Sequence, residues 1–287
     1  MEAVCYCHSV TYNRVLVLTG DEAVAARNAE VGIALAERLD AAVHLLRVAD
    51  TQSSRLSLGA DASTAATEQA GPPDLEELVA ETAVDGRVHT AEGPLREQVL
   101  RYATDADVDL VVIGPQANTG AFDGLVDGVA RAADVPVLAV PDAAARVQFE
   151  QLVVPNLETV PSEAAAEHAM AVAEAHGAAV SVVTVIDLQR AAGPFNAGGV
   201  SEAFIERKER ELRAPVEAAA DLDGDLTFET LTAPGRPGEA LDEYVADAGA
   251  DALVVGRGRT TPLVGRLRPT GASRIRQTVD VPVLVVP

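Results

Sequence analysis

The sequence predicts an α/β protein made of two similar domains, each a five-stranded, mostly parallel sheet with helices on both faces. Three observations lead to this fold class. The chain has 287 residues, a length that suits two domains of about 140 residues each. Its strand-like segments are apolar throughout and alternate with helical patterns, which is typical of buried parallel strands in βαβ units. The chain also contains an internal repeat.

The repeat relates two segments of each half, and the residues from Gly93 to Gly114 match the second half in one ungapped register. The segment Asp134-Val-Pro-Val-Leu-Ala-Val-Pro recurs from Asp280, and Asp109-Leu-Val-Val-Ile-Gly recurs from Asp251. Six upstream residues match at the same spacing: Gly93, Glu97, Tyr102, Asp105, Ala106 and Asp109 correspond to Gly235, Glu239, Tyr244, Asp247, Ala248 and Asp251. We therefore expect an N-terminal extension at 1–12, a first domain at 13–142 and a second domain at 150–287.

In each half, a compact apolar run is a predicted strand, and apolar residues at helical spacing predict a helix. For example, Glu22–Leu39 places Val24, Val31 and Leu35 on one face. In the first half, strands are expected at Arg14–Leu18, 43–48, 87–90, Leu110–Ile113 and 136–140, and helices at Glu22–Leu39, 75–83, 95–106 and 124–133. In the second half, strands are expected at 151–154, 180–186, 227–230, 252–255 and 282–286, and helices at Glu163–His176, 200–220, 238–248 and 272–279.

Two stretches, 51–71 and 193–199, follow the second strand of each half and are rich in small and polar residues. Ligands of parallel sheets bind at the carboxyl ends of the strands, where both stretches are expected. Two interpretations stay open for them, a tolerated surface insertion and a ligand lid.

Composition excludes several classes of function. The chain carries 44 Asp plus Glu against 22 Lys plus Arg, a formal net charge of −22, so its overall surface repels nucleic acid. Only one basic residue is Lys, Lys208, which indicates adaptation to high salt, as in a halophile; GC-rich codon usage is the alternative. No apolar run has the length of a membrane helix, and the N-terminus lacks a signal-peptide pattern, so we expect no membrane partner and a cytoplasmic location.

The two cysteines, Cys5 and Cys7, lie in the N-terminal extension, next to His8. Two thiolates and an imidazole could recruit a soft metal, but structural zinc normally takes four ligands inside a closed fold. A frayed terminal segment is the preferred interpretation, and we expect no metal requirement.

The last strand-to-helix loop breaks the acidic pattern. Six arginines and no Asp or Glu occur between Ala252 and Val279. Glycines at a strand end and backbone amides at a helix start attract phosphate, which predicts an anion cradle. Its predicted members are Gly256, Arg257, Gly258, Arg259, Gly271 and Ser273. The alternative is that these arginines pair with the chain's own carboxylates. The equivalent loop of the first half has no Arg and contains Asp123 and Asp127, so only the second domain is expected to bind an anion.

These motifs resemble the universal stress protein family in its tandem form, from about Arg14 onward. The resemblance implies two Rossmann-like domains of the adenine nucleotide alpha hydrolase-like type, and an ATP-phosphate loop between the fourth strand and the last helix. This loop departs from the family spacing: Gly256 and Gly258 are one residue too close, and Ala272 stands where Ser or Thr is expected. The family Asp after the first strand is displaced to Asp21 in the first half and replaced by Asn156 or Glu158 in the second.

The resemblance and the charge pattern together predict a cytoplasmic, non-catalytic binding module for a nucleotide, ATP or AMP, or for another small anion. The alternative is a degenerate scaffold or interaction protein of the same fold. The third hypothesis is an enzyme. The sequence has neither a phosphate-loop lysine motif nor a nucleophile elbow, which argues against this hypothesis. We expect the last strands of the two halves to meet as an internal pseudo-dimer, which could assemble further into a homo-oligomer.

Overall fold

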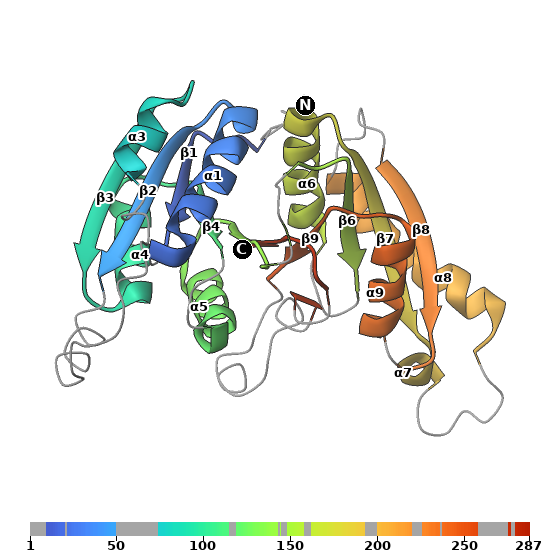
Figure 1. Ribbon diagram of the computed structural model, residues 1–287. Coiled ribbons are helices and arrows are strands. Elements are labelled where there is room, and N and C mark those ends of the chain that lie inside the picture. Colours follow the sequence, from blue (N-terminus) through green and yellow to red (C-terminus); the bar gives the residue numbers. More distant parts are fainter. Residues whose placement is uncertain are drawn as a thin grey trace, which may run out of the picture. The chain divides into compact units, whose positions relative to one another are not determined.

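The computed structural model describes residues 10–20, 22–49, 74–114, 119–142, 144, 148–157, 162–192, 200–219, 226–235, 237–257, 275–276 and 279–287 (Figure 1). The chain divides into two compact units. We call Tyr12–Val147 the first unit and Gln148–Pro287 the second unit.

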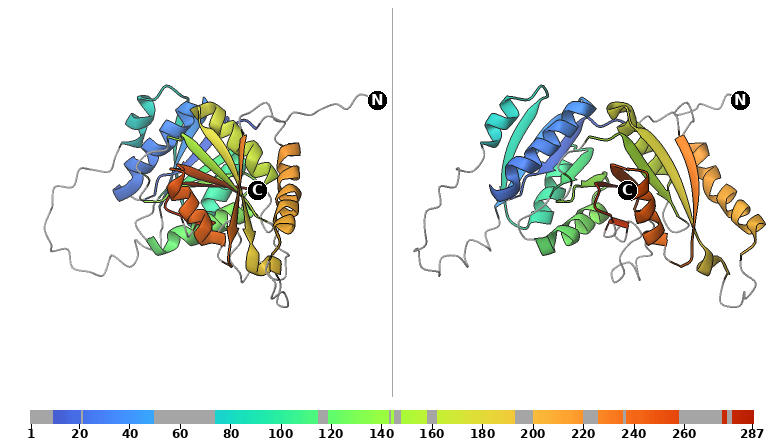
Figure 2. Two further views of the ribbon diagram at one scale, coloured as in Figure 1. Left: turned by 90° about the vertical axis from the view of Figure 1, so that its right-hand side faces the viewer. Right: turned by 45° about the vertical axis from the view of Figure 1, so that its right-hand side comes forward.

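The first unit is built on a parallel sheet with the strand order β3-β2-β1-β4-β5. Its strands are β1 (Arg14–Leu18), β2 (Ala42–Ala49), β3 (Gly86–Glu92), β4 (Leu110–Ile113) and β5 (Val137–Ala139). Its helices are α1 (Glu22–Leu39), α3 (Leu75–Ala80), α4 (Leu95–Asp105) and α5 (Thr119–Ala132). Helices α1 and α3 cover one face of this sheet and α4 and α5 the other (Figures 1 and 2).

The second unit repeats this arrangement, with the parallel strand order β8-β7-β6-β9-β10. Its strands are β6 (Gln151–Asn156), β7 (Ala179–Asp187), β8 (Leu226–Ala233), β9 (Ala252–Gly256) and β10 (Val283–Val286). Its helices are α6 (Glu163–His176), α7 (Leu188–Ala192), α8 (Glu202–Ala219) and α9 (Pro237–Asp247). The structure thus confirms the predicted fold class, two α/β domains with parallel sheets and helices on both faces.

The central strands are buried on both faces, as their apolar sequences predict. Strands β4, β9 and β10 contain no residue outside the buried class. The edge strands differ: in β3 and β8, exposed and half-buried residues interrupt the pattern. Each core is made almost entirely of Val, Leu, Ile and Ala side chains, which agrees with the scarcity of aromatic residues in the chain.

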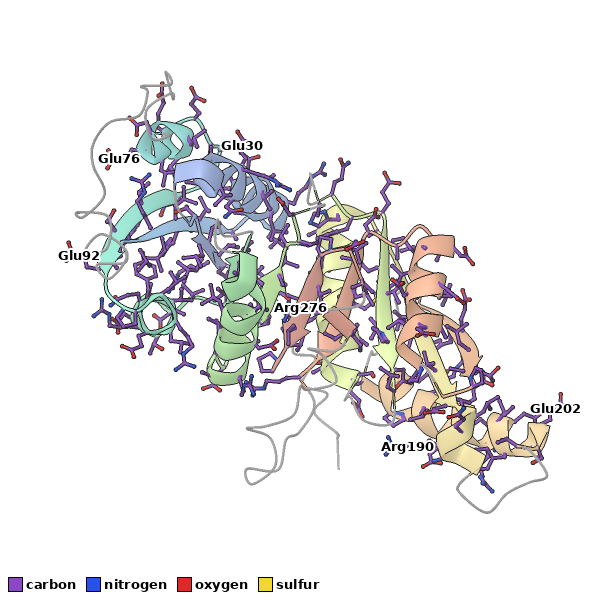
Figure 3. All side chains as sticks on the ribbon, turned by 60° about the horizontal axis from the view of Figure 1, so that its bottom comes forward. Glu30, Glu76, Glu92, Arg190, Glu202 and Arg276 are labelled. Carbon is purple, nitrogen blue, oxygen red and sulfur yellow. The ribbon has the colours of Figure 1, made fainter. Side chains whose placement is uncertain are left out.

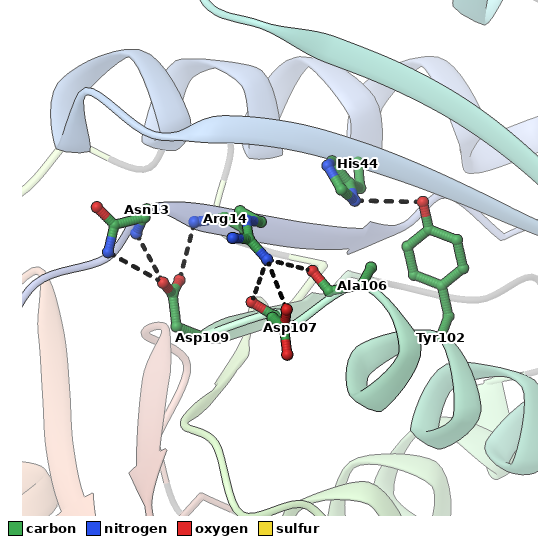
Figure 4. Close-up of polar contacts among 7 residues, drawn as sticks. All are labelled: Asn13, Arg14, His44, Tyr102, Ala106, Asp107 and Asp109. Carbon is green, nitrogen blue, oxygen red and sulfur yellow. Dashed lines mark hydrogen bonds and ion pairs between the residues drawn. The ribbon is translucent and has the colours of Figure 1, made fainter.

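Two residue pairs of the internal repeat now have a physical explanation. Gly93 and Gly235 follow β3 and β8 and adopt positive φ angles of 122° and 89°, which favour glycine. Asp109 and Asp251 precede β4 and β9 and accept hydrogen bonds from the backbone at the start of the neighbouring strand. Figure 4 shows this contact for Asp109. The repeated residues therefore hold the sheet edges and turns of both units.

Some element boundaries differ from the sequence predictions. Helix α5 begins at Thr119 rather than at 124, and α3 ends at Ala80 rather than at 83. The short helix α7 was not expected. It begins because the Asp187 carboxylate accepts the backbone N–H groups of Gln189 and Arg190, at 3.0 and 3.2 Å. Of the predicted helix at 272–279, only 275–276 are described as helical.

Acidic side chains lie on the outer surface of each unit. Glu30, Glu76, Glu92 and Glu202 are exposed and point away from the ribbon in Figure 3. Within the described ranges, no helix combines the length and the apolar character that crossing a membrane requires.

Candidate functional site

The candidate ligand site of each unit is the pair of strand ends at which the strand order reverses. In a sheet of this topology, ligands bind outside the carboxyl ends of the strands at that reversal. In the first unit it lies between β1 and β4, which pair with Leu18 opposite Ile113. In the second unit it lies between β6 and β9, which pair with Val153 opposite Leu253.

The first unit closes this place with buried polar side chains. Thr19 directly follows β1, is fully buried, and sends both its backbone N–H and its hydroxyl to the carbonyl of Leu46 on β2, at 3.1 and 3.2 Å. Asn28 of α1, which is 2% exposed, donates from Nδ2 to the Thr19 carbonyl at 3.0 Å. A Cβ on Gly114, just after β4, would lie 2.1 Å from Oδ1 of Asn28, so the amide lies directly against Gly114.

The second unit places different groups at the equivalent tips. Asn156, the last residue of β6 and 4% exposed, donates from Nδ2 to the hydroxyl of Thr184 at 3.3 Å and to the carbonyl of Leu212 in α8 at 2.8 Å. Ser162 donates its hydroxyl to the Pro155 carbonyl at 3.1 Å, which ties the start of α6 to the end of β6. These contacts hold the tip of β6 to β7, to α8 and to the start of α6.

Two members of the predicted cradle lie at the tip of β9. Gly256 is the buried last residue of that strand and pairs with Val286 of β10. Arg257 follows and donates its backbone N–H to the Val286 carbonyl at 2.7 Å. Gly258, Arg259, Gly271 and Ser273 lie outside the described residues. Arg276, another arginine of the same loop and helix segment, is described and is only 7% exposed (Figure 3).

The two units carry different polar residues at the end of their first strand. Thr19 and Asn156 are equivalent residues. The pairing of the first strand with the second begins at Arg14, opposite Ala42, in the first unit and at Gln151, opposite Ala179, in the second. Thr19 and Asn156 each lie five residues after that point. Asn156, the last residue of β6, is thus the second-unit counterpart of Thr19, while Asp21 and Glu158 lie outside the described residues. Both side chains at this place donate hydrogen bonds to protein oxygens.

A second polar cluster lies in the first unit, away from the strand tips. The Tyr102 hydroxyl of α4 lies 3.2 Å from Nδ1 of His44 on β2 (Figure 4). The centroid of the Tyr102 ring lies 4.9 Å from that of His89 on β3. Burial, followed by the charge of Arg87, lowers the pKa of His44 below its usual value. Burial raises the pKa of Tyr102.

The equivalent tyrosine of the second unit makes a different contact. Tyr244 of α9 donates its hydroxyl to Oε1 of Glu229 on β8, at 2.9 Å. Burial and this hydrogen bond both raise the pKa of Tyr244. The tyrosine of the repeat therefore packs a helix onto the two outer strands in both units, which agrees with a packing role.

Sequence reasoning did not single out Thr19 and Asn28. A signal for Asn28 exists: it lies four residues after Val24 and three before Val31, on the apolar face of its helix. A polar residue on a buried face needs a hydrogen-bond partner, but the sequence does not show which one. Among the residues that the structure describes, no group of His, Cys, Asp and Glu side chains could hold a metal ion.

The fold and the strand-tip arrangement define a class of protein, the Rossmann-like α/β domain in tandem. The family model "Universal stress protein family" matches residues 11–141 and again residues 148–287. The chain therefore belongs to the universal stress protein family.

Two solved structures of similar length agree with this fold. A functionally unknown protein from Pseudomonas aeruginosa PAO1 is 17% identical, with a TM-score of 0.62, and the match covers 96% of this chain and 92% of that one. A universal stress protein from Archaeoglobus fulgidus is also 17% identical, with a TM-score of 0.58 and 96% of both chains covered. A universal stress protein in complex with cAMP is 22% identical over 49% of this chain and 99% of its own, with a TM-score of 0.35. No curated protein is similar enough in sequence to match.

Proposed function

We propose that the protein is a non-catalytic binding module that takes a nucleotide or another small anion at the strand tips of its second unit. ATP and AMP are the first ligands to test. The cradle would be formed by Gly256, Arg257, Gly258, Arg259, Gly271 and Ser273. No metal is needed for this mode of binding, because the arginines supply the positive charge.

The observation that carries this proposal is the local reversal of charge at the tip of β9. A chain of net charge −22 has six arginines and no carboxylate between Ala252 and Val279. Gly256 and Arg257, which begin this segment, lie at the strand end beside β6 and β10. Guanidinium groups and glycine-flanked backbone amides are the groups that bind phosphate oxygens in proteins.

Isothermal titration of the full chain with ATP and with AMP tests this proposal, at low and at high salt. We expect one site, with an affinity that falls as salt rises, since exposed charges are screened. The double variant R257A/R259A should weaken binding at least about tenfold, the effect of losing charged hydrogen bonds. The R210A variant is the control, because Arg210 lies on an exposed part of α8. No heat with either nucleotide, while the protein is folded, rejects the proposal.

A scaffold or interaction protein of the same fold is the second candidate. It is favoured by the polar side chains at the ends of β1 and β6, because Thr19 and Asn156 already donate their hydrogen bonds to protein oxygens. In that case the arginines would lie in a subunit interface of a homo-oligomer. Replacing Arg266 and Arg268 by Ala should then lower the mass measured by light scattering, and an unchanged mass counts against this candidate.

We also propose a cytoplasmic location and a halophilic source. The acidic surface and the near absence of Lys support the halophilic source, because carboxylates keep a surface hydrated at high salt. An internal pseudo-dimer of the two units, joined through their last strands, completes the proposal. Melting temperatures that rise steadily from low to molar KCl would support the halophilic source, and a melting temperature independent of KCl would reject it.

A further inference from the structure

We infer that Asn28 is a clamp that closes the strand tips of the first unit to ligands, and that Ala165, at the equivalent place of the second unit, provides no such clamp. The inference rests on the proposed function, because it assigns which of two similar units takes the ligand. The proposed function names the cradle residues that would bind a ligand. This inference adds a residue, Asn28, that excludes one.

The clamp joins two strands at the point where the strand order reverses. The Asn28 amide bonds to the carbonyl of Thr19, the residue after β1, at 3.0 Å. Its other end lies so close to Gly114, the residue after β4, that a Cβ there would approach Oδ1 to 2.1 Å. One amide therefore fills the space between the two tips at which a ligand of such a sheet would bind.

A second layer of hydrogen bonds fixes this arrangement. Thr19 is fully buried and is bonded twice to the carbonyl of Leu46, which lies on β2. The tips of β2, β1 and β4 are thus linked through Thr19 and Asn28. A ligand entering between β1 and β4 would have to displace an amide that is 2% exposed and break its bond to Thr19.

The second unit cannot make the same clamp. Ala165 lies in α6 nine residues after Asn156, as Asn28 lies in α1 nine residues after Thr19. Helices α1 and α6 also end alike, with Asp40 and Gly177 in the left-handed conformation. Ala165 is fully buried and its side chain is a methyl group, which has no atom that could bond to the tip of β6 or β9.

The charge of the two loops agrees with this asymmetry. The segment after β9 carries six arginines up to Val279, whereas residues 114–128 after β4 carry Asp123 and Asp127 and no Arg, and Arg131 follows them. The unit without the Asn28 clamp is therefore the one whose sequence attracts an anion. Opening the first unit should admit a neutral ligand rather than a phosphate, so adenosine is the appropriate probe for it.

The deciding experiment measures how many adenosine molecules bind to wild-type protein and to N28A and N28S, by isothermal titration of the full chain. Neither replacement reaches both tips, and Ser keeps a polar group in case Ala lowers the yield of folded protein. We expect one more adenosine site in at least one folded variant than in the wild type, with its Kd in the millimolar range or below. Folded variants that bind the same number of adenosine molecules as the wild type overturn the inference.

The reciprocal experiment moves the clamp to the second unit. The A165N variant should bind ATP at least tenfold more weakly than A166N, which adds the same amide at a neighbouring, equally buried position of α6. Equal affinities overturn the inference. Failure of the proposed function is a separate result. If the wild-type protein binds neither ATP nor AMP, the proposed nucleotide site of the second unit is rejected. The number of adenosine molecules bound by N28A still tests whether Asn28 closes the first unit.

Discussion

The carboxylates of Asp109 and Asp251 make the same contact in the two units. Asp109 accepts the backbone N–H groups of Asn13 and Arg14, at 2.8 and 3.0 Å, and Asp251 accepts those of Glu150 and Gln151, at 2.7 and 2.9 Å. Each carboxylate thus joins the start of the central strand to the strand beside it. This contact gives a structural reason for the repeated Asp and leads to the first prediction.

Replacing either Asp109 or Asp251 by Ala should lower the free energy of unfolding by about 1–3 kcal/mol, because one part-buried and one exposed N–H group lose a charged acceptor. Asn keeps one acceptor oxygen, so D109N and D251N should lose less. Urea unfolding followed by circular dichroism measures the difference. Alanine variants as stable as the asparagine variants would show that the contact contributes little.

Glycines in two helices predict opposite effects of the same substitution. A Cβ on Gly32 of α1 would meet Val17 of β1 at 2.2 Å, whereas a Cβ on Gly124 of α5 meets nothing within 4 Å. G32A should therefore destabilise the protein by about 1–3 kcal/mol through overpacking. G124A should stabilise it by about 0.5–1 kcal/mol, because Ala is the better helix former. Thermal unfolding of both variants tests this, and a shift of the same sign in both contradicts it.

Histidine burial predicts a loss of stability in mild acid. Burial lowers the pKa of His168 to about 4, against about 6.5 in an unfolded chain. The unfolded state therefore takes up the proton first as the pH falls, so stability decreases from about pH 6.5 to about pH 4 and then levels off. The full loss from this group is up to about 3 kcal/mol.

The H168Q variant tests this assignment, because Gln does not titrate. Its free energy of unfolding should fall less than that of the wild type between pH 7 and pH 5. His44, whose pKa is also lowered, should leave a smaller dependence of the same sign in the variant. Parallel curves for the two proteins would mean that His168 does not cause the effect.

Removing the Tyr102 hydroxyl should separate its polar role from its packing role. Y102F loses the contact with His44 but keeps the ring against His89, so we expect a cost of about 1 kcal/mol. Y102A also loses the ring. Such a loss lowers the free energy of unfolding by about 3–5 kcal/mol at a fully buried site. The loss should be smaller here, because Tyr102 is only half-buried. Equal losses in the two variants would contradict this division.

Much of the fold follows from local patterns in the sequence. Continuous apolar runs such as Leu110–Ile113 predict buried parallel strands, because only a sheet covered on both faces hides every side chain of such a run. Helix α7 was missed, because its start depends on one carboxylate, that of Asp187, which turns back onto two N–H groups. Such a local hydrogen bond leaves no periodic pattern.

The candidate site is less accessible to sequence reasoning. The arginine-rich segment stands out from charge alone, and Gly256 and Arg257 lie at the predicted strand tip. The clamp could not be foreseen, since it depends on the proximity of Thr19, Asn28 and Gly114, and the last of these is far away in the sequence. Proximity of this kind is a product of strand order, which a single sequence does not state.

The position of β1 between β2 and β4 has a consequence for how the chain folds while it is being synthesised. Strand β1 cannot gain its second neighbour until residues 110–113 have been made, because its pairing with β4 spans most of the first unit. Contacts so distant along the chain form slowly and expose strand edges in the meantime. The first unit can nevertheless complete its sheet before β6 leaves the ribosome, so we expect the duplicated halves to fold one after the other and to avoid exchanging their equivalent strands.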